Sequence, residues 1–354
     1  MGRARSLAES YRRFGEVDAA QPSALNARVA AALGESDEAL RAIEATPPHR
    51  RHPAVILAAL HDLALAGRAP ALAAAYATAD GDGAARAAVD TLLRMPDAVV
   101  ALALRRPVVS FDTGRCAVLY PAVAEAARRV GAEAVGLVDV GCAAGANLVV
   151  DRVAISYSDG RSLGDPASPV RLSSSVVGDL PVPSRPMPEV VARVGVDPDP
   201  LDVTDASDVR WLRACLAPDL TEQVARLEAQ LSLAATVPPS LLRGDAVELL
   251  PDALARVPAA VLPVVTTTWA LSSLPPGSRL AFLRRLQEAA VGRPVAWVSV
   301  EGVAVAPAVP TLGDRHGSGH SIVGVAVLDG PSLVVDAVAR CYSGGRWLAW
   351  LAAA

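Results

Sequence analysis

The chain has 354 residues, a length that fits two domains or one large domain with an added subdomain. Hydrophobic residues make up 52% of it and charged residues 20%, so it can bury a core, and global disorder is excluded. All 33 basic residues are arginine. This excludes Schiff-base chemistry and phosphate clamps that need a lysine.

The formal net charge of -4 and the absence of a basic stripe exclude the main driving force for nucleic-acid binding. No apolar run reaches the roughly 18–20 residues of a transmembrane helix, and no leader-like segment begins the chain. We therefore expect a cytoplasmic protein with neither a nucleic-acid nor a membrane partner. No Cys-x-x-Cys pair occurs, so we expect neither a metal nor a disulfide framework; the four cysteines are Cys116, Cys142, Cys215 and Cys341.

Residues 1–130 are predicted to form an all-α N-terminal subdomain. Apolar residues recur at helical spacing among good helix formers in residues 23–33, 54–65 and 84–93. Prolines separate these segments, and the sequence Gly81-Asp-Gly83 predicts a turn between two helices. The subdomain shows no chemistry of its own.

Residues 131–354 are predicted to form an α/β domain, because short apolar runs alternate with helical segments, a pattern typical of parallel strands covered on both faces. The last two runs, Ser321–Leu328 and Leu333–Ala339, are joined by Asp329-Gly330 and predict an antiparallel hairpin. A strand-like insertion is expected over about residues 153–185. The predicted parallel strands are Val135–Val140, Val190–Val196, Leu241–Arg243, Val261–Thr266 and Val295–Val300.

A loop of small residues follows the first predicted strand in Leu137-Val-Asp-Val-Gly-Cys-Ala-Ala-Gly-Ala-Asn-Leu148. Small residues after a strand allow a nucleoside cofactor to approach the backbone closely. A dinucleotide-binding loop of the Gly-x-Gly-x-x-Gly type would have glycine at positions 143 and 146, where this sequence has Ala143 and Ala146. The sequence matches the S-adenosylmethionine-binding pattern acidic-x-Gly-x-Gly-x-Gly at Asp139, Gly141 and Gly145, and it departs from that pattern only at Ala143. The predicted cofactor-binding residues here are Asp139, Gly141, Ala143, Gly145 and Asn147.

Two further strand ends carry acidic residues. A carboxylate can accept two hydrogen bonds from ribose hydroxyls, and both Asp159 and Asp197 are candidates. Asp197 is preferred because Asp159 lies in a Ser-Asp-Gly sequence typical of a turn. After the third strand, Asp245 and Ala246 stand where a carboxylate and a backbone N–H would meet an adenine ring, although an aspartate there also caps a helix.

From about residue 131 onward the sequence resembles the class I S-adenosylmethionine-dependent methyltransferases. The whole chain is more closely similar to a bacterial family of unknown function with a methyltransferase-like fold. The matching segments are Ser110–Pro121, Gly141–Leu148 with Asp151-Arg152, Gly164–Pro166 with Ser168-Pro169, Arg193–Asp197, Leu201–Asp205, Arg210–Arg213, Arg243–Asp245, Trp297–Glu301 and Gly345–Trp347 with Trp350. The chain departs from that family at Phe111-Asp112, at Cys142–Ala144 and at the fourth strand, which lacks a histidine.

The resemblance implies a doubly wound, Rossmann-like domain with S-adenosylmethionine as cofactor. Strand-end position makes Thr267, Trp269 and Glu301 candidates for catalysis. Asp112 and Arg115 are also candidates, with a local ion pair between them as the alternative. We expect a methyltransferase acting on a small molecule. The alternatives are a binding or regulatory protein that retains the fold, or an enzyme that uses S-adenosylmethionine for other chemistry.

Overall fold

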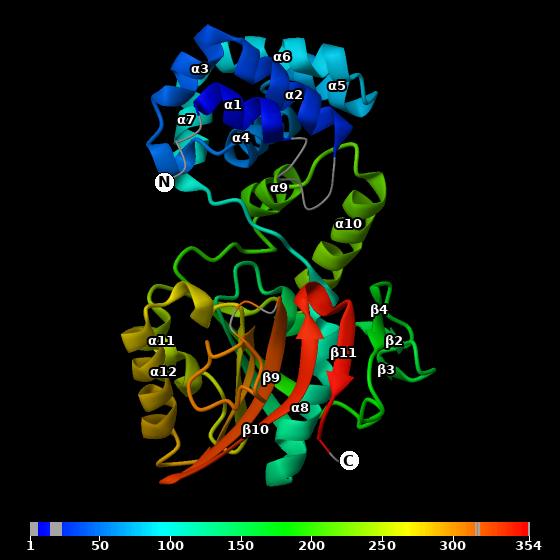
Figure 1. The fold of residues 1–354 in the computed structure, drawn as a ribbon, viewed down its shortest axis with the longest axis vertical. Coiled ribbons are helices and arrows are strands. Elements are labelled where there is room, and N and C mark those ends of the chain that lie inside the picture. The colour runs from blue at the N-terminus through cyan, green and yellow to red at the C-terminus, as the bar shows by residue number, and fades with distance from the viewer. Residues whose placement is uncertain (1–5, 15–22, 316, 318, 353–354) are drawn as a thin grey trace. The chain divides into compact units, whose positions relative to one another are not determined.

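A computed structural model describes residues 6–14, 23–315, 317 and 319–352 (Figure 1). Its internal contacts divide the chain into two compact units. Unit 1 comprises Met1–Ser110 and Asp205–Glu228, and unit 2 comprises Phe111–Thr204 and Ala229–Ala354. The sequence-based border near residue 130 therefore differs from this division, because the helix Cys116–Val130 belongs to unit 2 and a segment of the α/β half belongs to unit 1.

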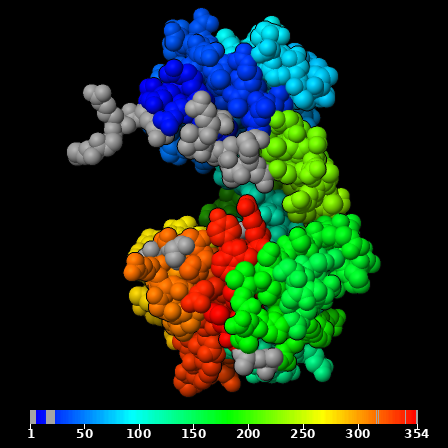
Figure 2. Space-filling view, turned by 45° about the vertical axis from the view of Figure 1, so that its right-hand side comes forward, coloured from blue at the N-terminus to red at the C-terminus, as the bar shows by residue number. Residues whose placement is uncertain are grey.

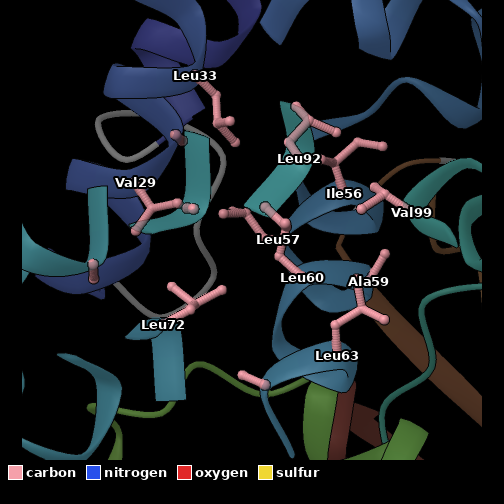
Figure 3. Close-up of a cluster of buried hydrophobic side chains, with 14 of the residues drawn as sticks. Val29, Leu33, Ile56, Leu57, Ala59, Leu60, Leu63, Leu72, Leu92 and Val99 are labelled. Atoms are coloured by element: carbon pink, nitrogen blue, oxygen red, sulfur yellow. The ribbon is translucent and has the colours of Figure 1, made fainter. Parts of the chain in front are cut away.

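Unit 1 is helical. Its core is an apolar cluster around α4, which is buried along nearly its whole length; Figure 3 shows Leu60 of this helix among Leu33, Leu72 and Leu92. The elements are α1 (Leu7–Arg13), α2 (Ala24–Glu35), α3 (Asp37–Glu44), η2 (Pro48–Arg50), α4 (Pro53–Leu65), α5 (Pro70–Ala77), α6 (Gly81–Arg94), α7 (Pro96–Arg105), α9 (Ala206–Ala214) and the first part of α10 (Thr221–Ala235).

The predicted turn at Gly81-Asp-Gly83 is wrong, because these residues form the first turn of α6. The side chain of Asp80 accepts a hydrogen bond from the N–H of Gly83 at 2.9 Å and so caps the helix. An N-cap aspartate satisfies a helix donor that would otherwise lack a partner. It thereby offsets the low helix propensity of the two glycines.

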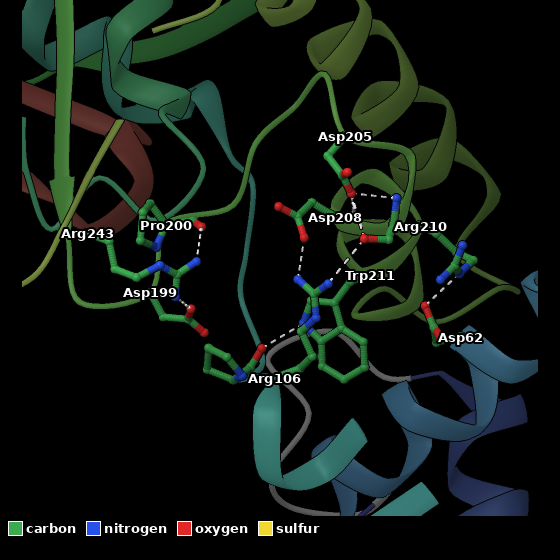
Figure 4. Close-up of polar contacts among 11 residues, drawn as sticks. Asp62, Arg106, Asp199, Pro200, Asp205, Asp208, Arg210, Trp211 and Arg243 are labelled. Carbon is green, nitrogen blue, oxygen red and sulfur yellow. Dashed lines mark hydrogen bonds and ion pairs between the residues drawn. The ribbon is translucent and has the colours of Figure 1, made fainter. Parts of the chain in front are cut away.

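The inserted helix α9 is joined to the rest of unit 1 by polar contacts (Figure 4). Arg210 donates to the buried carboxylate of Asp62 at 3.0 Å, and the indole N–H of Trp211 donates to the carbonyl of Pro107 at 2.8 Å. Arg106 pairs with Asp208. These contacts, with the ion pair between Arg213 and Glu228, account for the polar side chains of the segment Arg210–Arg213 without a ligand.

Unit 2 is built on a large, mostly parallel sheet whose strand order is β3-β2-β4-β11-β10-β9-β8-β7-β1-β5-β6. The helices α11 (Ala246–Ala255) and α12 (Pro276–Ala289) lie on one face and α8 (Cys116–Val130) on the other (Figure 1). The strands are β1 (Ala134–Val140), β2 (Ala154–Tyr157), β3 (Ser162–Gly164), β4 (Arg171–Val176), β5 (Glu189–Asp197), β6 (Ser240–Arg243), β7 (Leu262–Thr268), β8 (Val295–Gly302), β9 (His320–Asp329), β10 (Ser332–Tyr342) and β11 (Trp347–Trp350). The expected mixed α/β class with a helical N-terminal region is confirmed.

The antiparallel end of the sheet contains the predicted hairpin. β9 pairs with β10 through the turn at Asp329 and Gly330, and β9 also pairs antiparallel with β8. The strand-like insertion expected at about residues 153–185 contains β2, β3 and β4. β4 pairs with β11, so the insertion extends the sheet; Figure 2 shows the red C-terminal strands beside the green insertion.

Within the described residues, no single helix is long and apolar enough to cross a membrane. The pair α4 and α5 meets the length and composition together, but it is bent by 99°.

Candidate functional site

The carboxyl ends of the parallel strands bring most of the predicted site residues to one place in unit 2. β1 lies between β5 and β7, so the chain order reverses on its two sides. In open α/β sheets, ligands bind outside the carboxyl ends of the strands at such a switch point. We call the ends of β1, β5, β6, β7 and β8, with the loops that follow them, the carboxyl edge.

In the small-residue loop after β1, every second residue has a left-handed backbone conformation: φ is 72° at Gly141, 50° at Ala143 and 78° at Gly145. Alanine disfavours this region by roughly 1–2 kcal/mol, so Ala143 is held there by its surroundings. A Cβ atom on Gly141 would lie 2.7 Å from the methyl group of Ala270. The helical segment expected from the alternation of strands and helices is here only the short 3₁₀ turn η4 (Ala146–Val149).

Asp197, at the end of β5, fixes the loop. One of its carboxylate oxygens accepts a hydrogen bond from the N–H of Ala143 at 2.9 Å, and the other accepts from the N–H of Asp199 at 2.8 Å. Asp159 lies instead in the turn between β2 and β3, where it accepts from the backbone N–H of Arg161 at 3.1 Å. Of the two candidate acids, Asp197 is thus the one at the carboxyl edge.

Asp139 is completely buried beneath the loop. Its carboxylate accepts hydrogen bonds from the hydroxyl of Thr266 at 2.6 Å and from the side-chain amide of Asn147 at 3.1 Å. The same amide donates to the hydroxyl of Thr268 at 2.9 Å. Burial raises the pKa of Asp139 to about 6, while these hydrogen bonds and the charge of Arg115 oppose the rise. Through these hydrogen bonds, Asp139 and Asn147 connect the small-residue loop to the end of β7.

The threonine run that ends β7 divides between the two faces of the sheet. Thr266 and Thr268 face Asp139, and Arg115 donates to both the carbonyl and the hydroxyl of Thr268 at 3.3 Å. Thr267, a predicted catalytic residue, is fully buried on the other face and accepts a hydrogen bond from the indole N–H of Trp297 at 3.0 Å. The structure brings Arg115 to the carboxyl edge but buries Thr267 in the core.

Trp269, directly after β7, is half-buried and has φ of 60°. The left-handed region is a genuine outlier for a bulky side chain, and such strain is concentrated at functional sites. Its N–H donates to the carbonyl of Val300 at 3.1 Å, which links this strained residue to β8.

Glu301, near the end of β8, is 1% exposed. Its Oε1 accepts a hydrogen bond from the N–H of Leu271 at 3.0 Å, at the start of the 3₁₀ helix η5 (Leu271–Ser273). Its Oε2 is buried and has no hydrogen-bond partner in the described part of the chain. Burial raises the pKa of Glu301 to about 7, against the lowering effect of the backbone N–H groups that it faces.

Asp245 caps α11, the alternative role considered for it. Its Oδ1 accepts hydrogen bonds from the N–H groups of Val247 and Glu248 at 2.8 and 3.1 Å. Oδ2 of Asp245 and the N–H of Ala246 take no part in these two capping hydrogen bonds. Beside it, at the ends of β6 and β5, Arg243 pairs with Asp199 (Figure 4).

Asp112 is exposed and accepts a hydrogen bond from the N–H of Gly114 at 2.8 Å, which begins the 3₁₀ helix η3 (Thr113–Arg115). Between described residues, no ion pair joins Asp112 to Arg115, although this pair was an alternative reading of the motif. A Cβ atom on Gly345 would overlap the carbonyl oxygen of Gly114. Gly114 and Gly345 therefore allow the two backbone segments to approach each other closely.

Asp151 and Arg193 form a largely buried ion pair through two hydrogen bonds of 2.7 Å each; their side chains are 14% and 8% exposed. Arg152 is more exposed and lies 3.2 Å from the same carboxylate. Within the described ranges, no group of three or more histidine, cysteine, aspartate or glutamate side chains is arranged to hold a metal ion.

Thr266, Thr268, Ala270 and Leu271 were not singled out from the sequence, yet they connect the predicted residues to one another. The available signal was their position at a strand end next to Thr267 and Trp269. The side-chain direction that separates Thr266 from Thr267 depends on the face of the sheet that each residue occupies.

The model of a family described as an uncharacterized protein conserved in bacteria (DUF2332) matches residues 8–350. The chain belongs to this family. The expected similarity to an uncharacterised bacterial family is thereby confirmed. No curated protein matches the chain. The match spans both units: it includes Arg210–Arg213 of unit 1 and the loop Gly141–Leu148 of unit 2.

Proposed function

We propose that this DUF2332 protein binds S-adenosylmethionine at the carboxyl edge of unit 2 and methylates a small-molecule acceptor. The observation that carries the proposal is the loop 141–145, which adopts three alternating left-handed residues although alanine replaces glycine at position 143. The N–H of Ala143 donates a hydrogen bond to Asp197, so the loop is joined directly to the residue that is the candidate to bind the ribose.

The donor chemistry fits the cofactor. A carboxylate offers about four lone-pair sites, and the two backbone bonds to Asp197 leave capacity for two ribose hydroxyls. The N–H of Ala246 and Oδ2 of Asp245, both outside the helix cap, provide a donor and an acceptor for the edge of an adenine ring.

Two predicted residues receive positioning roles in this proposal. Asp139 is buried and holds the loop through Asn147, so it acts on the loop and not directly on the ligand. Glu301 holds the segment after β7 through Leu271. When bound, the cofactor supplies a methyl group on a positively charged sulfur. Arg115 and Trp269 are the predicted catalytic side chains that flank this edge; Arg115 would orient an anionic acceptor.

Isothermal titration calorimetry with S-adenosylmethionine and S-adenosylhomocysteine tests the proposal. We expect both to bind, and Asp197→Asn to weaken binding by roughly tenfold or more, since a hydrogen bond to a charged group contributes about 1.5–3 kcal/mol. Asp159→Asn is the matched control and should bind like the parent. Thermal unfolding of each variant verifies its fold. Absence of heat with both compounds at millimolar concentration refutes cofactor binding.

A second candidate function is a cofactor-binding protein without methyl transfer. It is favoured by the burial of Thr267 and Glu301, which are 0% and 1% exposed and already accept hydrogen bonds within the protein. Mass spectrometry of the cofactor after incubation with a bacterial metabolite extract separates the two. Formation of S-adenosylhomocysteine supports the methyltransferase, and binding without conversion supports the second candidate.

A further inference from the structure

Unit 1 contains an apolar pocket that the proposed function does not use. It has a volume of about 350 Å³ and lies between α4, α5 and the inserted segment, so every lining residue belongs to unit 1. This volume is at the lower end of the range of small-molecule sites. Most of the lining side chains are alanine, leucine, valine or proline, among them Ala64, Leu65, Ala73, Pro218, Val224 and Leu227.

Two aromatic side chains, those of His61 and Tyr76, belong to the pocket lining. The rings of His61 and Tyr76 meet edge to face, with their centroids 5.3 Å apart. Nδ1 of His61 lies 3.3 Å from the carbonyl oxygen of Ala214, which occupies that nitrogen. The hydroxyl of Tyr76 is buried and has no partner among the described residues. Because this oxygen is closed to a water-sized atom, a molecule in the pocket would contact the ring of Tyr76 and not its hydroxyl.

The pocket carries no unbalanced charge. Arg213 and Glu228 pair with each other through hydrogen bonds of 2.5 and 2.6 Å. Burial lowers the pKa of His61, which is therefore neutral at pH 7, and burial raises the pKa of Tyr76, which keeps its proton. Since an uncompensated charge would lose hydration without a partner, an uncharged ligand suits this lining.

We propose that this pocket binds a small, uncharged, apolar molecule that packs against the rings of His61 and Tyr76. The His61 and Tyr76 rings favour a ligand with an aromatic ring, because aromatic pairs gain about 0.5–1.5 kcal/mol beyond their buried area. The site is independent of the carboxyl edge, since its residues all lie in unit 1.

The neutral fluorescent probe N-phenyl-1-naphthylamine, which has aromatic rings and one amine N–H, tests the proposal on the full chain. We expect saturable binding with one site and enhanced fluorescence. Ala73→Trp fills the pocket and should weaken binding at least tenfold. The matched control is Ala74→Trp, which substitutes the exposed next position of α5, outside the pocket lining, and should bind like the parent.

Two further variants keep the test decisive if Ala73→Trp fails to fold. Ala77→Trp fills the pocket from an exposed position and should also weaken binding. Tyr76→Phe keeps the ring that lines the pocket and loses no hydrogen bond with any described residue, so it should unfold at the parent temperature or above and bind the probe like the parent. Absence of saturable binding, or equal binding by the parent, Ala77→Trp and Ala74→Trp, overturns the proposal.

Discussion

The carboxylate of Glu301 accepts a hydrogen bond from the backbone N–H of Leu271 at 3.0 Å and so joins the end of β8 to the loop after β7. The preceding residue, Ala270, lies so close to Gly141 that no Cβ atom fits there. Through its hydrogen bond with Leu271, Glu301 therefore helps to position the loop after β7 against the small-residue loop. Its buried carboxyl also makes the stability of unit 2 depend on pH.

We expect Glu301→Gln to flatten the dependence of stability on pH. The pKa of Glu301 is about 7 in the folded protein, above its usual value of 4.5, so the folded state binds this proton more tightly than the unfolded state. The associated stability is fully present below pH 4.5 and is lost as the pH rises to about 7. Glutamine cannot titrate but can still accept from Leu271.

Urea unfolding between pH 4.5 and 8 measures this effect. The free energy of unfolding of the parent should fall relative to Glu301→Gln by up to about 3 kcal/mol over the interval, at about 1.4 kcal/mol for each pKa unit. Glu288→Gln, at an exposed residue that pairs with Arg285, is the control and should follow the parent. Parallel curves for the parent and Glu301→Gln would contradict the assignment.

Gly141→Ala should destabilise the protein more than Gly131→Ala. Both glycines have positive φ, 72° and 67°, so both substitutions incur about 1–2 kcal/mol of backbone strain. Only at Gly141 does the new methyl group meet a neighbour, Ala270, which adds about 1–3 kcal/mol. Urea unfolding gives the two losses, and equal values would show that the two loops do not touch.

Asp151→Asn should cost about 3–5 kcal/mol of unfolding free energy, since it removes the carboxylate that neutralises the largely buried charge of Arg193 and leaves that charge with neutral acceptors such as the carbonyl of Leu148. Arg152→Gln removes an arginine half-exposed beside the same carboxylate and should cost about 0–1 kcal/mol. Chemical denaturation of both variants separates the roles. A loss for Arg152→Gln as large as that for Asp151→Asn would contradict the assignment of the buried pair.

The strands were predictable because apolar runs covered on both faces are distinctive. The predicted Val135–Val140 and Val295–Val300 appear as β1 (Ala134–Val140) and β8 (Val295–Gly302). The hairpin was predictable from Asp329-Gly330, whose glycine adopts φ of 54°. The helical start at Gly81 was not, because it depends on the cap by Asp80 and overrides glycine's low propensity.

The site was predictable only as a set of strand ends. The sequence placed Asp139 and Thr267 at the carboxyl edge, where β1 and β7 do end. Their surroundings depend on contacts between strands that are distant in sequence, such as the bond from Thr266 to Asp139. The orphaned hydroxyl of Tyr76 depends in the same way on how helices pack, which periodicity does not reveal.

A crystal structure of the protein with S-adenosylhomocysteine tests the central claim most directly. The account predicts ligand density at the carboxyl edge, with the ribose hydroxyls within hydrogen-bond distance of Asp197 and the adenine edge beside Asp245 and the N–H of Ala246. Density at any other place, or an empty edge in crystals grown at saturating ligand, would contradict it.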